Sequence, residues 1–322
     1  MDAWIDRMIE CLSPELARDL RVGEALAVKY QNRPKSVFKY REDCPHSREN
    51  LENDCVWISS PTSYSDPYDS SIAITSSILT NQIIIEGVKA FIANELSSEL
   101  EAHDIELILS DPNPALMLGK VIMEKVEPVP SEQQTVMSGA FSKMLQGWEE
   151  AFKSKLPVAH KESLKVCSFS GTHDSIIMWS HYGDQHRGFC IEYDTESMSE
   201  GDLFMRLLYP VVYSKKLFDG TRYYDAALQN KQAFNILFPA LATLYKSPEW
   251  SYEKEWRLVL PANMVKKASI WRVPTPKRIY LGSLMASDKR EEIADICRRK
   301  KIEVHRMHLL DDSFALRSEK VQ

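Results

Sequence analysis

The chain has 322 residues, a formal net charge of −6 and 27% charged residues, a composition typical of a folded globular protein. This acidic balance provides no general attraction for nucleic acid or for an anionic membrane surface. No apolar run reaches the roughly 18 residues that a membrane span needs. The first segment, MDAWIDRMIECL, carries acidic residues and has no secretory cleavage pattern. We therefore expect a cytoplasmic protein without membrane contact.

Cysteine and glycine usage argues against several common kinds of site. The six cysteines form no C-x-x-C pair, which is typical of free thiols in a reducing compartment. No glycine-rich phosphate-binding motif occurs in the sequence. Possible zinc ligands gather in one region of the sequence: Cys167, His173, His181, His186 and Cys190. Their spacing matches no zinc-binding pattern, so we predict no metal site.

The first half of the chain alternates between helical and extended patterns. Residues 1–34 are predicted as two helices, with Ser13-Pro14-Glu15 as the cap between them. Residues 36–41 form a predicted strand, and residues 42–54 a polar turn-like segment. Residues 56–69 are a predicted strand that enters a loop rich in serine and proline. From 82 to 155 the apolar spacing is helical, which predicts an inserted lid or subdomain.

Strands return in the second half of the chain. We predict strands at 163–175, 187–194 and 207–214, with one or two helical turns at 176–186. Tyr223 to Tyr245 reads as one long amphipathic helix. The chain then closes with a strand at 278–282, a helix at 287–300 and a strand at 302–310. The predicted class is α+β, with residues 35–81 and 156–322 forming the core around the 82–155 insertion.

The stretch SPEWSYEKEWRLVLP, residues 247–261, carries the most suggestive polar pattern. Read as a strand after Pro248, it places Glu253, Glu255 and Arg257 on one face. The two carboxylates would lie about 7 Å apart at their Cα atoms, given a rise of ~3.3 Å per residue. At that separation each raises the proton affinity of the other. The alternative is an amphipathic strand whose solvent-facing side happens to be ionic.

Three further groups are candidates for ligand contact. Arg41 follows Lys39 on an early strand, and its planar fork suits a phosphate, although a surface cation is the simpler interpretation. Ser168 and Ser170 alternate on one strand, so their hydroxyls point to the same side.

The segment MWSHYGDQHRG combines imidazole and aromatic groups around glycine. His181, Tyr182 and His186 could contact a planar ring, or could pack and cap the end of a short helix.

The order of these motifs resembles the Arg–Ser–Glu class of ADP-ribosyltransferases. KYR at 39–41, SFS at 168–170 and EKE at 253–255 stand where that class has its arginine, its Ser-Thr-Ser and its Glu-x-Glu. An aromatic pair, Trp250 and Tyr252, precedes the glutamates as in the family. This chain departs from the pattern in Phe169, which replaces threonine, in its large helical insertion, and in the longer gap between serines and glutamates.

This resemblance implies a split β-sheet core with NAD as the consumed substrate. It implies that Arg41 holds a phosphate, that Ser168 contacts the ribose, and that Glu255 holds the ribose 2′-hydroxyl and steadies the oxocarbenium-like transition state. Glu253 would position or deprotonate the acceptor. The expected site therefore has Glu255, Glu253, Ser168 and His181 as catalytic residues and, as cofactor-binding residues, Lys39, Arg41, Ser170, Tyr182, His186 and Trp250.

A second resemblance covers more of the chain. KYR, WISSPTSYSDPYD, CSFS, MWSHYGDQHRGFCIEYD, PVVYS and WSYEKEWRLVL resemble the bacterial family known as domain of unknown function 2971. Within the second of these motifs, Tyr64 and Ser65 replace the family's phenylalanine and asparagine. This resemblance implies a toxin-like or defence effector role, with an antitoxin or another partner protein.

The combined expectation is an NAD-consuming ADP-ribosyltransferase or NAD glycohydrolase with a protein or nucleic-acid acceptor. Two alternatives stay open on the sequence. One is a non-catalytic module that binds a nucleotide or a partner protein through the same cleft. The other is a nuclease that uses His181, His186 and the carboxylates, against which the acidic balance counts mildly.

Overall fold

The computed structural model describes residues 2–125, 131–229, 234–265 and 269–321, and an eight-stranded sheet forms its centre. Adjacent strands are antiparallel except for one parallel pair at the C-terminal end, β12 with β13. The predicted α+β class is therefore confirmed. The strands, in spatial order, are β14 (Leu316–Lys320), β13 (Glu303–Leu309), β12 (Arg278–Leu281), β5 (Phe189–Asp194), β1 (Ser36–Arg41), β4 (Leu164–Ser170), β10 (Glu255–Pro261) and β6 (Leu208–Pro210).

Each face of the sheet packs its own apolar cluster. Phe38 and Tyr40 of β1 pack with Trp179 on one face, whereas Val37 packs with Phe169 on the other. This alternation follows from the two-residue period of a strand. The parallel pair β12 and β13 is joined by α12 (Ser287–Lys300), which supplies the crossover that a parallel connection needs.

The sheet opens between β1 and β4. β1 pairs with β5 from Ser36 to Arg41, and β4 pairs with β10 from Leu164 to Ser170, but β1 and β4 share only the register pair Phe38 with Ser170. The two strands therefore diverge beyond that pair. Side chains from both faces of the sheet can reach the space between them.

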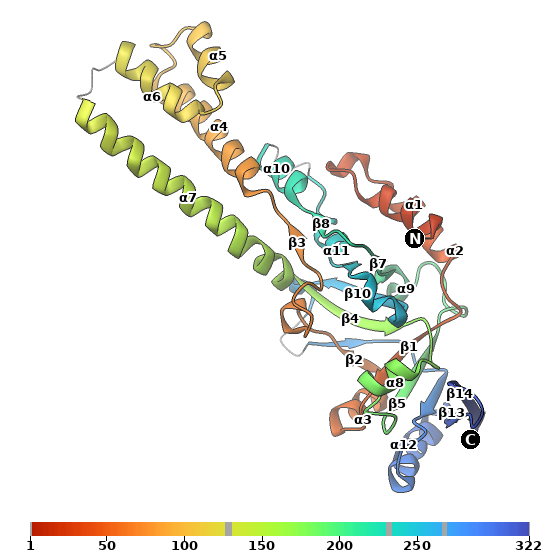
Figure 1. Cartoon of the computed structure of the whole chain (residues 1–322). Helices are drawn as coiled ribbons and strands as arrows, with labels where there is room; N and C mark the ends of the chain where they lie inside the picture. Colours follow the sequence, from red (N-terminus) through yellow and green to blue (C-terminus); the bar gives the residue numbers. More distant parts are fainter. Residues whose placement is uncertain (1, 126–130, 230–233, 266–268, 322) are drawn as a thin grey trace.

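A helical arm, residues 76–162, projects from the sheet (Figure 1). The segment 82–155, for which the apolar spacing is helical, lies mostly within the helices of this arm where the structure describes it. It has its own apolar cluster, to which Val88, Ile108 and Leu118 belong, separate from those of the sheet. Its helices are α4 (Ser76–Glu95), α5 (Ala102–Ser110), α6 (Pro114–Lys125) and α7 (Ser131–Glu162).

Shorter elements complete the fold around the sheet. The helices are α1 (Ala3–Leu12), α2 (Val22–Gln31), α3 (Pro45–Glu52), α8 (Ile176–Tyr182), α9 (Leu203–Leu207), α10 (Thr221–Gln229) and α11 (Phe238–Ala242). Three two-stranded pairs join β2 (Cys55–Trp57) with β11 (Ile270–Arg272), β3 (Ile72–Ala73) with β8 (Phe218–Asp219), and β7 (Val212–Tyr213) with β9 (Tyr245–Lys246). Single 3-10 turns lie at Ala17–Asp19, Pro61–Ser63, Pro248–Glu253 and Ala262–Met264. Within the described ranges, no helix combines the length and apolar character needed to cross a bilayer.

Several predicted elements are wrong in detail. The segment 42–54 is not a turn but contains α3, which starts at Pro45 and buries Leu51 against the sheet. The cap at Ser13-Pro14-Glu15 starts no helix, because α2 begins only at Val22.

The predicted long helix from 223 to 245 is also wrong, because it is divided into α10, α11 and β9; residues 230–233 lie outside the described ranges. The cause is Asn235, whose side-chain amide donates to the carbonyls of Leu12 and Pro14 and fixes the chain there in a non-helical form.

Candidate functional site

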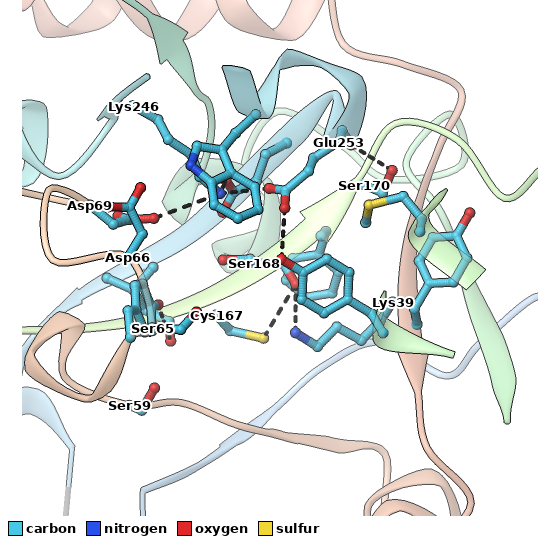
Figure 2. A pocket seen from close by; sticks show the side chains of 18 of the residues that line it. Lys39, Ser59, Ser65, Asp66, Asp69, Cys167, Ser168, Ser170, Lys246 and Glu253 are labelled. Carbon is cyan, nitrogen blue, oxygen red and sulfur yellow. Dashed lines mark hydrogen bonds and ion pairs between the residues drawn. The ribbon is translucent and has the colours of Figure 1, made fainter. Parts of the chain in front are cut away.

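A cavity of about 470 Å³ occupies the opening between β1 and β4. The loop of residues 59–69 closes one side, and the segment from Lys246 to Glu255 closes another. Glu253, Ser168 and Lys39 follow one another across it (Figure 2). We call this space the first cavity. Because its walls come from segments far apart in the sequence, it exists only in the folded chain.

Five buried ionic residues form an ionic cluster, of which all but the arginine line the first cavity: Asp69, Lys246, Glu253, Glu255 and Arg257. The Lys246 Nζ atom lies 2.6 Å from Glu253 Oε2 and 2.8 Å from Glu255 Oε2. Arg257 donates from Nε to Glu255 Oε1 at 2.8 Å and from Nη2 to Asp69 Oδ2 at 2.7 Å. Three carboxylates against two cations leave the cluster with an excess of one negative charge. This excess favours a cationic ligand group.

The two glutamates of the cluster have pKa values that move in opposite directions. Burial opposes ionisation of Glu255, but the charges of Arg257 and Lys246 outweigh it and hold the pKa of Glu255 well below its usual range. Burial, and then the neighbouring Glu255 charge, raises the pKa of Glu253 despite its contact with Lys246. Paired carboxyl groups with separated pKa values are a recurring arrangement for acid–base work. Glu253 is therefore the member suited to exchange a proton.

Aromatic side chains surround Glu253. The Tyr182 hydroxyl donates to Glu253 Oε1 at 2.7 Å, and burial together with the Glu253 charge raises the pKa of this tyrosine, so it keeps its proton. The Trp250 ring lies over Lys246, with the ammonium 4.9 Å from the ring centroid. Both rings line the first cavity. They offer apolar surfaces beside the acidic group.

The local backbone brings the two glutamates together in an unexpected way. Residues 248–253 form a 3-10 helix rather than a strand, and Lys254 takes a left-handed conformation with φ 46° before β10 begins at Glu255. The prediction of a continuous strand across 249–261 is therefore wrong for its first part. Gly171 donates its N–H to the Lys254 carbonyl, which holds this corner. The glutamates meet because both reach Lys246.

The opposite end of the first cavity is cationic. Lys39 donates from Nζ to the Ser168 carbonyl at 2.7 Å, and burial lowers the pKa of its ammonium. The Nε and Nη2 atoms of Arg41 are buried and have no hydrogen-bond partner among the described residues. Buried guanidinium nitrogens without a partner are costly, so this end of the cavity suits an anion.

Most of the predicted site residues line this single cavity: Lys39, Arg41, Ser168, Ser170, Tyr182, Trp250, Glu253 and Glu255. Lys39 and Arg41 alternate on β1 with Phe38 and Tyr40, so only the divergence of β1 from β4 lets them share it with Ser168. Ser170 is buried, and its hydroxyl donates to the Glu253 carbonyl at 2.7 Å. This serine holds the glutamate segment rather than the cavity contents.

The two predicted histidines lie outside the first cavity. His181 is exposed, with Nδ1 3.5 Å from the Tyr252 hydroxyl, and lines a shallow depression beyond Lys39. His186 stacks on Trp179, with ring centroids 6.2 Å apart, and its Nε2 lies 3.3 Å from Ser180 Oγ. The prediction that both histidines belong to the site is therefore corrected. At the end of α8, neither ring reaches the first cavity. Within the described ranges, no three histidine, cysteine or carboxylate side chains gather as a metal site.

Three residues of the ionic cluster were not predicted as site residues. Arg257 was placed on the face of Glu253 and Glu255 but given no role, although its side chain is fully buried. Asp69 ends the serine-rich loop, and Lys246 lies between the predicted helix 223–245 and the stretch 247–261, at a position for which no element was predicted. Two features of the sequence could have indicated this cluster: the acidic residue that ends the 56–69 motif, and an arginine within a mostly apolar strand.

Comparison with known proteins identifies one family. The model described as "Protein of unknown function (DUF2971)" matches residues 178–258. This match confirms the resemblance of the sequence motifs to that family for the segment that runs from within α8 into β10, which holds every member of the ionic cluster except Asp69. No curated protein and no solved structure gave a significant match.

Proposed function

We propose that the first cavity binds NAD and that the protein cleaves the bond between nicotinamide and ribose, as an ADP-ribosyltransferase or NAD glycohydrolase does. One observation carries the proposal. The half-buried guanidinium of Arg41, whose Nε and Nη2 atoms have no hydrogen-bond partner among the described residues, and a buried pair of glutamates line the same opening in the sheet. The first suits a phosphate group, and the second suits positive charge that develops on a sugar. The divergence of β1 from β4 supports a split-sheet core of the ADP-ribosyltransferase kind.

The negative excess of the ionic cluster fits the chemistry of this bond. The nicotinamide ring of NAD is cationic, and positive charge moves onto the ribose as the ring leaves. Tyr182 and Trp250 offer ring faces beside the cluster on which nicotinamide can stack. Ser168 is partly exposed in the cavity wall between the cationic end and the acidic end, where it can contact the ribose.

The two glutamates take different roles in this proposal. Both oxygens of Glu255 accept hydrogen bonds from Arg257, and one also accepts from Lys246. We therefore assign Glu255 to holding negative charge beneath the reacting sugar. Glu253, with its raised pKa, receives the proton of the attacking water or acceptor hydroxyl. Tyr182 fixes the orientation of the Glu253 carboxyl group.

The test is nicotinamide release from NAD by the purified protein. The Glu253→Gln variant should be slower by about 10²–10⁴-fold, the range for removal of a general base. The matched control is Glu106→Gln, which changes an exposed carboxylate on the helical arm and should leave the rate unchanged. Absence of release by the wild type, or full activity of a folded Glu253→Gln protein, would contradict the proposal.

A non-catalytic nucleotide-binding role is the second candidate, and the saturation of the cluster favours it. Lys246 and Arg257 satisfy the carboxylates that a reaction would need. In that case NAD would raise the melting temperature of the wild type, and Arg41→Ala would remove the effect, while no nicotinamide would appear. The nuclease alternative has less support, because His181 and His186 lie outside the first cavity.

A further inference from the structure

A second cavity adjoins the first one and has no role in the proposed cleavage. Its volume is about 930 Å³, and it shares Asp66, Lys246 and Trp250 with the first cavity. Trp250 therefore forms part of the wall of both spaces. A molecule in the second cavity would lie next to the group that reacts in the first.

Aromatic surface is available at the mouth of the second cavity. The Tyr68 side chain is 68% exposed, which is unusual for a large ring in a fixed turn. The turn is fixed because the Tyr68 N–H donates to Asp66 Oδ1 at 2.8 Å and Lys161 Nζ donates to the Pro67 carbonyl at 2.8 Å. An exposed ring on a fixed backbone turn is suited to stacking on a planar group, because the backbone loses little conformational freedom on binding.

Two lysines lie on the other side of the second cavity. Lys215 and Lys216 are exposed, and their ammonium groups have no ion pair within the described ranges. Their turn is held by Ser214, whose hydroxyl accepts from the Lys216 N–H at 3.0 Å and donates to the Lys216 carbonyl at 2.8 Å. Two adjacent cations on a fixed turn suit a phosphate group.

We propose that the second cavity binds a nucleotide, with its base against Tyr68 and Trp250 and its phosphate between Lys215 and Lys216. Proteins that bind single-stranded nucleic acid without sequence preference combine positively charged groups with aromatic side chains on which the bases stack. The ligand is a free nucleotide or the phosphorylated end of a strand. The cavity needs only one phosphate contact, so the overall charge of −6 does not oppose binding.

The position of this site gives the nucleotide a role as acceptor, and only that role rests on the proposed function. The bond from ribose C1′ to the nicotinamide nitrogen breaks, and its electron pair leaves with nicotinamide. An oxygen or nitrogen of the bound nucleotide forms the new bond to C1′, and its proton passes to Glu253. The protein is then a transferase that modifies a nucleotide rather than a hydrolase.

Calorimetric titration with AMP tests the binding. Two molecules should bind per wild-type chain, one of them in the first cavity through Arg41. The double variant Lys215→Glu, Lys216→Glu should lose one of them, with affinity at that site at least about tenfold weaker, a change of 1.4 kcal/mol. Arg41→Ala should lose the other. The matched control reverses two exposed lysines of the helical arm, Lys120→Glu and Lys143→Glu, and should still bind two.

The outcomes separate the two proposals. A single bound AMP that the Lys215, Lys216 variant leaves unchanged overturns the second site. Loss of AMP in that variant, without any nicotinamide release by the wild type, supports the second site and contradicts the proposed function.

A 5′-phosphorylated oligothymidylate of about twelve nucleotides distinguishes a free nucleotide from the phosphorylated end of a strand as the ligand. Binding at least about tenfold tighter than AMP, and lost in the same variant, identifies a strand end, whereas equal affinity identifies a free nucleotide.

Discussion

Arg257 is the residue on which the wall of the first cavity depends. Its guanidinium is fully buried and joins β10 to the loop that ends at Asp69, 188 residues earlier in the chain. It also donates to Glu255, to the Ser70 hydroxyl and to the Thr243 carbonyl. Such a group is tolerated in the interior because all its donors are directed at acceptors. Removing it leaves Asp69 and Glu255 buried with less compensation.

The Arg257→Met variant should therefore lose about 3–5 kcal/mol of unfolding free energy, as expected when one partner of a buried ion pair is removed. Urea denaturation followed by circular dichroism measures this loss. Arg187→Met is the control, because the Arg187–Asp184 pair is exposed and should contribute under about 1 kcal/mol. A loss as small as that of the control would mean that the ionic cluster does not support the fold.

At the scale of residues, the sequence predicts groups that are neighbours in the chain but not their distant partners. Glu253 and Glu255 could be found because a Glu-x-Glu pattern is visible in the sequence. Lys246 could not, because its contact with them depends on the 3-10 helix at 248–253 and on the left-handed Lys254, whereas a continuous strand was predicted for that stretch. His181 and His186 were predicted to lie in the site because the sequence alone does not show which way the chain turns at the end of α8.

Among the elements, the docking of α2 depends on a buried lysine. Lys29 donates from Nζ to the Met205 carbonyl at 2.7 Å and to the Arg206 carbonyl at 3.0 Å, at the end of α9. Its ammonium also lies 3.9 Å from the centroid of the Tyr209 ring. Burial is the main cause that lowers the pKa of Lys29 from 10.5 to about 7.

This shift predicts a pH dependence of stability. The unfolded chain binds a proton at Lys29 up to about pH 10.5, whereas the folded chain releases it above about pH 7. The unfolding free energy should therefore rise between these two values, on the order of a few kcal/mol. Below pH 7 the cost of burying the charge is fully present.

Urea titrations at pH 7 and pH 10 measure this rise. The contributions of the other titratable groups cancel when variants are compared, because the variants share those groups. Lys29→Met should remove most of the rise seen in the wild type. Lys35→Met, which changes an exposed lysine, should keep it. An identical rise in wild type and Lys29→Met would refute the assignment.

The predicted boundaries of elements are wrong where a tertiary contact outweighs the local preference for helix or strand. Residues 223–245 have helical spacing, yet the Asn235 amide binds the end of α1 and interrupts the helix. The predicted strand 207–214 is likewise divided, because the Val211 N–H donates to the Glu255 carbonyl while Val212 pairs with Tyr245. Neither contact leaves a mark in the local pattern.

For the whole molecule, the helical arm has an apolar cluster of its own. Its apolar cluster includes Ile92, Ile108 and Val121, and none of its members belongs to the clusters of the sheet. Regions with separate cores can open separately. The arm should therefore tolerate damage that leaves the first cavity intact.

Ile108→Ala should destabilise the arm by about 2–5 kcal/mol, since Ile108 is fully buried there. Amide hydrogen exchange should become faster across α4 to α7 and stay unchanged in β4 and β10. The control Ile279→Ala, a fully buried change in β12, should accelerate exchange in the sheet. Equal acceleration of arm and sheet by Ile108→Ala would show that they unfold together.

The fold class and the insertion follow from hydrophobic spacing, which is a local property. The order of strands is different, because neighbours such as β1 and β4 lie far apart in the chain and share only one register pair. Their divergence, which opens the first cavity, depends on contacts that spacing does not encode.

The reach of Arg257 back to Asp69 also constrains the order in which a ribosome can produce a working protein. A nascent polypeptide that has emerged only as far as the arm already carries Asp69 but lacks the guanidinium that pairs with it. The ionic cluster can therefore assemble only after β10 has left the exit tunnel.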